Sequence, residues 1–169
     1  MGGAGVGGQE GLLVALDSVL AESGDAAGIL ERAVDLLYRG RGYFWVGIYA
    51  RRGEEMVRQA FRGPVPPCLG FRLGQGNVGT TGQTGRTRII PDVRQDPTYR
   101  MCFQETRSEV VVPIRSGKEV VGVIDVESDR LDAFPPGEAG LLEEVAARIA
   151  PAVGEVAAPG PARLGRRDP

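Results

Sequence analysis

The 169-residue sequence contains no histidine and only two cysteines, Cys68 and Cys102. The missing histidine excludes a zinc site with a histidine ligand, and it excludes a Ser-His or Cys-His relay within one chain. Two cysteines in a reducing cytosol are more often free than bridged, so composition alone predicts two free thiols.

The sequence also lacks a strong charge of either sign and a long apolar run. Its formal net charge is −2, whereas nucleic-acid-binding proteins usually concentrate positive charge on one face. No apolar stretch approaches the roughly 20 residues that span a bilayer, and the N-terminus lacks the basic-then-apolar layout of a signal peptide. We therefore expect a cytoplasmic protein without a nucleic-acid or membrane partner.

The length suits one domain with a sizeable core. Apolar spacing predicts a helix over 12–20 and a second helix that Asp25 caps and that ends near Gly40 and Gly42. The remaining predicted elements are strands at 43–50, 56–61, 88–91, 108–114 and 119–128, a short helix after residue 74, and a helix from 137 to 150 or beyond. Residues 1–9 and 156–169 are expected to be disordered.

This order of elements predicts an α/β (α+β) fold with a central, mainly antiparallel sheet. Helices should pack on one face of the sheet, and the long loops 63–70 and 92–107 should cover the other. A sheet face roofed by ordered loops forms a pocket, and loops of this length are usually functional.

Acidic residues stand at neighbouring strand ends. Because side chains alternate along a strand, Asp125 and Glu127 share one face of the strand 119–128. Glu109 opens the neighbouring strand, and a short turn at 115–118 places it opposite residues in the low-to-mid 120s. These acids either are solvated strand ends or cluster, and clustering raises at least one pKa unless a cation arrives. An ammonium-bearing small molecule suits such a cluster better than a metal, because few other oxygen ligands lie nearby.

The first strand has one aromatic face. Trp45, Gly47 and Tyr49 point to one side, and Phe44 with Val46 is predicted to point to the other. The string GQGNVG at 74–79 fits a dinucleotide fingerprint by its letters, but that motif requires a parallel βαβ unit. We interpret these glycines as a tight backbone corner.

Both cysteines fall in the loops that should roof the pocket. Cys68 lies in the proline-rich segment GPVPPCLG, and Cys102 lies in the long polar loop before the strand 108–114. Cysteines in polar loops are more exposed than core cysteines, and exposure favours chemistry. The alternative is two unrelated free thiols.

The strings WVGIY, GQGNVG, IIPDV, RSEVVVPI and GVIDVES resemble those of a GAF domain, across about residues 10–155. Within that superfamily the chain looks like the free methionine-(R)-sulfoxide reductases, which are stand-alone GAF domains that reduce the sulfoxide of the free amino acid. The resemblance implies a thiol-dependent enzyme with no bound cofactor and a thioredoxin-type dithiol as reductant.

The resemblance assigns roles to individual residues. It makes Cys102 the catalytic thiolate and Cys68 the cysteine that resolves its sulfenic acid to a disulfide. Glu109 and Asp125 match the family's acids. They form the catalytic set with the two cysteines, and with Glu127 they would hold the substrate ammonium and supply a proton.

Two aromatic residues complete the implied site, and two positions depart from the family pattern. Trp45 and Tyr49 would enclose the apolar end of the substrate. Val78 stands where the family has a further cysteine, and Glu127 replaces an aspartate.

A non-catalytic GAF module that binds a small ligand and signals is the alternative function. Such sensors usually come attached to kinase, cyclase or DNA-binding domains, and none is present in these 169 residues, which favours the enzyme. A bilin site is disfavoured because such sites lean on histidine. A homodimer through residues 12–37 and 137–155 is expected, since GAF domains often pair through their terminal helices.

Overall fold

The computed structural model describes residues 8–158. In chain order the elements are α1 (Gln9–Ala21), α2 (Ala26–Arg41), β1 (Trp45–Arg52), β2 (Glu55–Arg62), β3 (Gly70–Arg72), α3 (Gly76–Thr84), β4 (Arg88–Ile90), η1 (Val93–Gln95), β5 (Ser108–Ser116), β6 (Glu119–Ser128) and α4 (Glu138–Ala157). Within the described range, no helix combines the length and apolarity that crossing a membrane requires.

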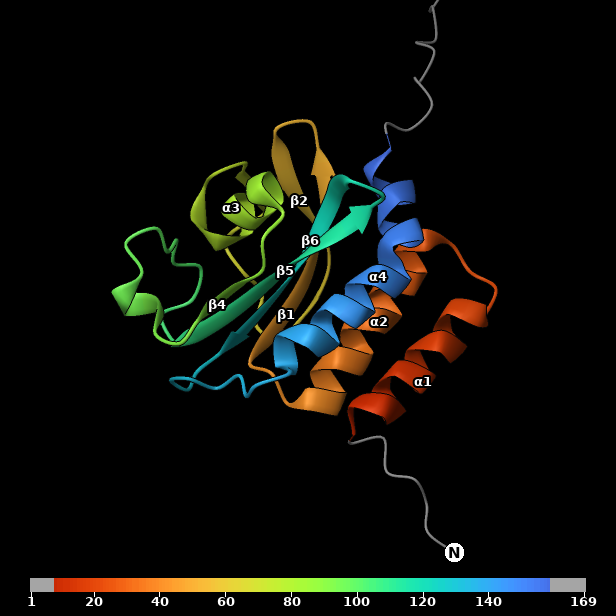
Figure 1. Ribbon diagram of the computed structural model, residues 1–169, viewed down its shortest axis with the longest axis horizontal. Coiled ribbons are helices and arrows are strands. Elements are labelled where there is room, and N and C mark those ends of the chain that lie inside the picture. Colours follow the sequence, from red (N-terminus) through yellow and green to blue (C-terminus); the bar gives the residue numbers. More distant parts are fainter. Residues whose placement is uncertain (1–7, 159–169) are drawn as a thin grey trace, which may run out of the picture.

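One six-stranded sheet organises the molecule. Its strand order is β3-β2-β1-β6-β5-β4, and every neighbouring pair is antiparallel. Helices α1, α2 and α4 cover one face, whereas α3 and the long loops lie over the other (Figure 1). The predicted α/β architecture is therefore confirmed.

The main hydrophobic core lies between the sheet and the three helices. Leu30 and Leu37 of α2 pack there with Ile149 of α4 and with Ile124 of β6. As predicted, Asp25 caps α2: its side chain accepts a hydrogen bond from the backbone N–H of Gly28 at 2.9 Å. Helix α2 ends at Gly42, whose φ of 67° is the left-handed conformation that glycine adopts readily.

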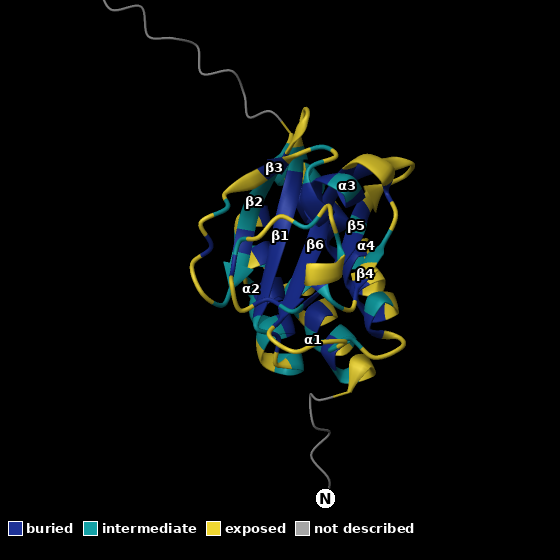
Figure 2. Ribbon diagram, turned by 90° about the vertical axis from the view of Figure 1, so that its left-hand side faces the viewer, coloured by how far each residue is buried: buried dark blue, intermediate teal, exposed yellow. Residues whose placement is uncertain are grey.

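A second, smaller core lies on the opposite face of the sheet. It includes Trp45 and Tyr49 of β1, Val123 of β6 and Phe103 from the loop before β5. Figure 2 shows the central strands β1 and β6 buried behind the exposed loops. The predicted faces of β1 and β6 are thus confirmed for these residues.

Phe44 does not follow the predicted alternation. Its ring packs edge-on against Phe103, with centroids 5.6 Å apart, and it joins the second core rather than the helix side. Strand β1 begins only at Trp45, so the alternation of side chains does not extend to Phe44.

Several boundaries differ from the predictions. The short strand β3 was not predicted, because it has three residues and directly follows the proline-rich loop. Helix α1 begins at Gln9, since Gly8 accepts the first helical hydrogen bond, from Leu12. Helix α4 runs past residue 150, as predicted, but it continues to Ala157 and so enters the segment 156–169 that was predicted to be disordered. The rest of the two segments predicted to be disordered, residues 1–7 and 159–169, lies outside the described residues.

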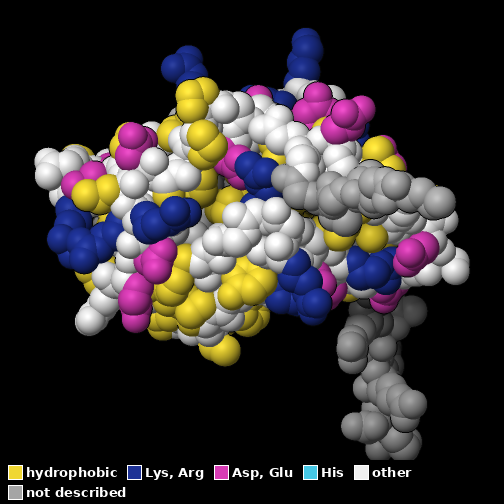
Figure 3. Space-filling view, turned by 90° about the horizontal axis from the view of Figure 1, so that it is seen from below, with side chains coloured by type: hydrophobic (Ala, Val, Ile, Leu, Met, Phe, Trp, Pro, Cys, Tyr) yellow, Lys and Arg dark blue, Asp and Glu magenta, His cyan; other side chains and the backbone are white. Residues whose placement is uncertain are grey.

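The surface carries no single dominant charge on the side that Figure 3 shows. Hydrophobic side chains form patches there between scattered basic and acidic residues. This mixture agrees with the small net charge of the chain.

Candidate functional site

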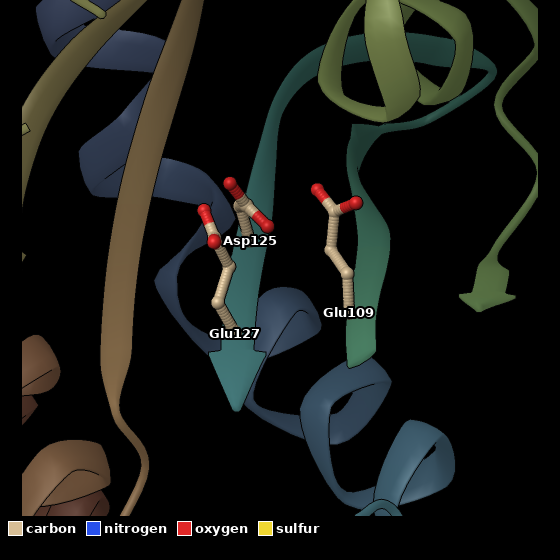
Figure 4. A group of neighbouring side chains, drawn as sticks. All are labelled: Glu109, Asp125 and Glu127. Carbon is tan, nitrogen blue, oxygen red and sulfur yellow. The ribbon is translucent and has the colours of Figure 1, made fainter. Parts of the chain in front are cut away.

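Three carboxylates meet on the loop-covered face of the sheet. Glu109 lies on β5, and Asp125 and Glu127 lie on β6; one oxygen of each falls within 4.8 Å of those of the other two. Figure 4 shows the three carboxyl groups converging from the two strands. All three side chains are buried, so the sequence prediction of a cluster holds and the alternative of solvated strand ends does not.

The register that brings them together differs from the predicted one. Glu109 lies opposite Glu127 rather than a residue in the low-to-mid 120s. Pairing continues to Ser116 and Glu119, so the turn is two residues shorter than the predicted 115–118, and a register shift between Ile114 and Arg115 moves the ladder by one more residue.

Burial and mutual repulsion favour the protonated forms of these acids. Burial raises the pKa of Glu109 to about 7, against the lowering effect of a hydrogen bond from Asn77. Burial and the charge of Glu109 raise the pKa of Glu127 to about 8. The pKa of Asp125 lies well above its usual value, because burial and then the charges of both glutamates oppose its ionisation.

The hydrogen bonds of the three acids differ. The Asn77 side-chain amide donates to Glu109 Oε2 at 2.5 Å, and the Thr106 hydroxyl donates to Glu127. Among the described residues, Asp125 Oδ1 is a buried acceptor without a hydrogen-bond partner. A buried polar atom without a partner is unfavourable, and a ligand with a donor group would satisfy it.

Aromatic side chains form the neighbouring wall. In the β1–β6 ladder Trp45 lies opposite Glu127, and Gly47 lies opposite Asp125. The Trp45 ring stacks on Phe61 and also contacts Tyr49, and its indole Nε1 is buried without a partner in the described chain. Burial and the charge of Asp125 raise the pKa of the Tyr49 phenol, so Tyr49 is neutral and can donate a hydrogen bond at neutral pH.

The two cysteines are bonded to each other. Cys68, from the loop between β2 and β3, forms a disulfide with Cys102, from the loop before β5, and their Cα atoms lie 5.8 Å apart. The prediction of two free thiols was therefore wrong, because the two loops meet above the sheet. Both cysteines are half-buried and pack against the core that contains Trp45 and Phe103.

The glycine-rich string forms the expected corner. Gly74 and Gly76 have φ values of 80° and 61°. A Cβ on Gly79 would lie 2.0 Å from the carbonyl oxygen of Arg72, so that position has no room for a side chain. The corner starts α3, which brings Asn77 over the acids.

Sequence reasoning missed three polar residues of this region, Asn77, Arg88 and Thr106. Nothing in a glycine-rich turn or a polar loop indicates which side chain will be buried. A buried asparagine needs hydrogen-bond partners, but only the folded chain shows that Asn77 finds them in Glu109 and Arg88.

The acidic cluster suits a cation with hydrogen-bond donors. Three carboxylate oxygens can also approach a divalent metal, but calcium takes six to eight oxygen ligands and magnesium needs an octahedral set. An ammonium group needs only a few acceptors and can donate to Asp125 Oδ1.

The sequence matches a known domain family. The model of the GAF domain family matches residues 25–153. The chain belongs to the GAF domain family.

The relatives include free methionine-R-sulfoxide reductases and a protein named for its GAF domain. GAF domain-containing protein A of Dictyostelium discoideum is 34% identical over 126 residues, which cover 74% of this chain and 79% of that protein. The free methionine-R-sulfoxide reductase of Saccharomyces cerevisiae is 35% identical over 109 residues, which cover 62% of this chain and 60% of that protein.

The fold of the reductase relatives agrees with that of this GAF domain. The structure of the Neisseria meningitidis free methionine-R-sulfoxide reductase in complex with its substrate superposes with a TM-score of 0.82 at 28% identity. The superposition covers 94% of this chain and 96% of that one. The predicted GAF fold is therefore confirmed, and free methionine-R-sulfoxide reductases are among its relatives.

Proposed function

We propose that this GAF domain reduces free L-methionine-(R)-sulfoxide to methionine with Cys102 as nucleophile and Cys68 as resolving cysteine. The observation that carries the proposal is the Cys68–Cys102 disulfide, which packs on the same core as Trp45 on the face that holds the acids. Methionine sulfoxide has an ammonium group, an apolar thioether end and a reducible sulfoxide. The acidic cluster, the aromatic wall and the thiol pair would act on these three groups in turn. The reductase relatives support the same reading.

In the first step the oxygen atom of the sulfoxide moves to the Cys102 sulfur. The Cys102 thiolate attacks the sulfoxide sulfur while a protonated carboxyl group of the cluster delivers a proton to the sulfoxide oxygen. The S–O bond breaks as the hydroxyl group moves to the Cys102 sulfur, the bond between the two sulfur atoms breaks, and methionine leaves with Cys102 as a sulfenic acid. A carboxyl group whose pKa is raised to neutral pH or above is a suitable acid for this transfer.

The second step forms the bond that the structure contains. The Cys68 thiol attacks the sulfenic sulfur, water leaves, and the disulfide forms. A thioredoxin-type dithiol then reduces it by exchange, supplying two electrons and two protons. The absence of a third cysteine at Val78 is no obstacle, because attack and resolution need two thiols.

Substrate binding falls to the remaining acids and the aromatic wall. The ionised carboxylate of Glu109 would hold the ammonium group, with an oxygen of Glu127 as a further acceptor, and Trp45 and Tyr49 would pack on the thioether end. Because the acids are buried, the substrate enters only when the roof loops move. We place this activity in the cytoplasm, where thioredoxin-type reductants are available.

The decisive experiment is turnover of free methionine-(R)-sulfoxide by the purified full chain with dithiothreitol. We expect Cys102→Ser to abolish turnover and Cys68→Ser to remove the recycling that thioredoxin supports. The (S)-epimer is the control substrate. A folded wild-type protein without turnover would refute the proposal.

A ligand-binding GAF sensor is the second candidate. It is favoured by the relative named only for its GAF domain, and by Val78, a buried core residue at the position of a family cysteine. Saturable binding of methionine sulfoxide without its consumption would select this function.

A further inference from the structure

A hydrogen-bonded chain runs from the acidic cluster to the segment that leads to Cys102. Arg88 Nε donates to Asn77 Oδ1 at 2.8 Å, and the Asn77 amide donates to Glu109 Oε2. Arg88 also approaches Asp96 at 3.5 Å and Thr98 at 3.4 Å. Neither Asn77 nor Arg88 belongs to the proposed catalytic set.

The chemistry of arginine fixes the direction of this chain. A guanidinium group has donors and no acceptor, so the Asn77 atom that faces Arg88 has to be the amide oxygen. The amide N–H₂ of Asn77 then has to face Glu109. A donor at that position requires an oxygen of Glu109 that accepts, which favours the ionised carboxylate.

The other two acids receive no comparable support from a charged network. The neutral hydroxyl of Thr106 donates to Glu127, and Asp125 Oδ1 has no partner in the described residues. Asn77 is 2% exposed, so water does not compete for its amide. The three acids are therefore chemically unequal although they share one small volume.

We propose that Asn77 and Arg88 are positioning residues that make Glu109 the most readily ionised of the three acids, and so the anchor for the substrate ammonium group, and leave Asp125 as the proton donor. The assignment of ammonium and proton rests on the proposed reductase function, but the action of the pair on Glu109 does not. Arg88 acts through Asn77, by fixing the orientation of its amide, and its charge also acts on Glu109 directly.

The direction of the pKa shifts agrees with this division. The hydrogen bond from Asn77 and the charge of Arg88 lower the pKa of Glu109, whereas no such group lowers that of Asp125. The charged and titratable groups that face Glu109 are Arg88 of β4, Asp96 of the following loop, Asp125 and Glu127 of β6, Tyr49 of β1, and Tyr99.

The test is a titration of the Glu109 carboxyl group in the oxidised full chain. Carbon-13 NMR of protein labelled at the glutamate carboxyls, with the signal assigned by Glu109→Gln, reports ionisation without any turnover. We expect Asn77→Leu to raise the pKa of Glu109 by about one unit or more. Arg88→Met should raise it in the same direction, and Arg88→Lys by less.

Two controls separate positioning from general disturbance. Arg86→Met removes an exposed cation two residues away and should leave the titration unchanged. In the double variant Asn77→Leu/Arg88→Met the two shifts should fall short of adding, because the part of the Arg88 effect that passes through Asn77 is lost only once. Fully additive pKa shifts would show that Arg88 does not act on Glu109 through Asn77.

The outcomes are distinct from those of the turnover assay. The proposal would be overturned, even if the protein is a reductase, by one result. That result is a Glu109 pKa that stays within about 0.3 pH units of wild type in both Asn77→Leu and Arg88→Met. If Asn77→Leu does not fold, the half-exposed Arg88 still gives the answer through Arg88→Met and Arg88→Lys. In an active enzyme the acidic limb of the plot of kcat/KM against pH should move to higher pH by the same amount as the pKa of Glu109.

Discussion

Glu109 and Glu127 lie directly opposite each other on β5 and β6. Like charges in directly opposed positions destabilise a sheet, and here both side chains are also buried beside Asp125. The sheet therefore tolerates the pair only while protons or a cation reduce the charge. The acidic cluster therefore lowers the free energy of unfolding by an amount that depends on pH.

Stability should fall as the pH rises from about 5 to 8.5. The pKa values of these acids are raised on folding, so the folded state binds more protons than the unfolded state in this range. The contribution is present below the unfolded pKa and is lost as the pH rises through the folded values. Denaturant unfolding at a series of pH values measures the slope.

Glu127→Gln should flatten that slope. The amide oxygen can still accept from Thr106, but the group no longer ionises. At pH 8.5 we expect a gain of about 1–3 kcal/mol over wild type, and at pH 5 little change. Glu119→Gln, at an exposed position of the same strand, is the matched control. Equal slopes for Glu127→Gln and wild type would contradict the prediction.

Reduction of the Cys68–Cys102 disulfide should lower the free energy of unfolding. The bond joins residues 34 apart in sequence, and the chain-entropy relation gives about 3–4 kcal/mol for a loop of that size. Urea unfolding with and without dithiothreitol measures the difference. Cys68→Ser should show no response to the reductant, and a response of equal size there would remove the disulfide as its cause.

Gly47→Ala should destabilise the second core. A Cβ at this position would lie 2.1 Å from Trp45 Cη2, so the indole ring has to move. We expect a loss of about 1–3 kcal/mol and weaker ligand binding. Gly140→Ala is the matched control: nothing lies within 4 Å of that Cβ, and alanine in α4 should add about 0.5–1 kcal/mol.

Trp45 should report the state of the site by fluorescence, because it is the only tryptophan of the chain. Trp45 packs on Phe103, with ring centroids 5.9 Å apart, and the disulfide packs on the same core. Since disulfides quench nearby indole emission, reduction should increase the intensity. Cys102→Ser should start at the higher intensity and should not respond to dithiothreitol.

Alternation along the strands was the feature that the sequence predicted best. It placed Trp45 with Tyr49 on one face of β1 and Asp125 with Glu127 on one face of β6, because period-two patterning is a property of the strand alone. The partner of Glu109 was misplaced, since the turn is shorter than predicted and the register shift between Ile114 and Arg115 moves the ladder one residue further.

Contacts between distant segments were harder to predict. The caps Asp25 and Gly42 are local signals and were identified, whereas the contact of Asn77 with Glu109 depends on how α3 lies over β5. The two cysteines show the same limit: composition predicted free thiols, and only the resemblance to a known family implied that they pair.

The disulfide also has a topological consequence. Cys68 follows β2 and Cys102 precedes β5, and between these strands in the sheet lie β1 and β6, which carry Trp45 and Asp125. The bond is thus a covalent link that passes over the two central strands and joins the loops on either side of them. Under the proposed scheme it fixes the order of events in turnover: methionine leaves before the disulfide forms, and the next sulfoxide reacts only after the disulfide is reduced. The reductant therefore also removes the covalent link between the two loops that cover the site.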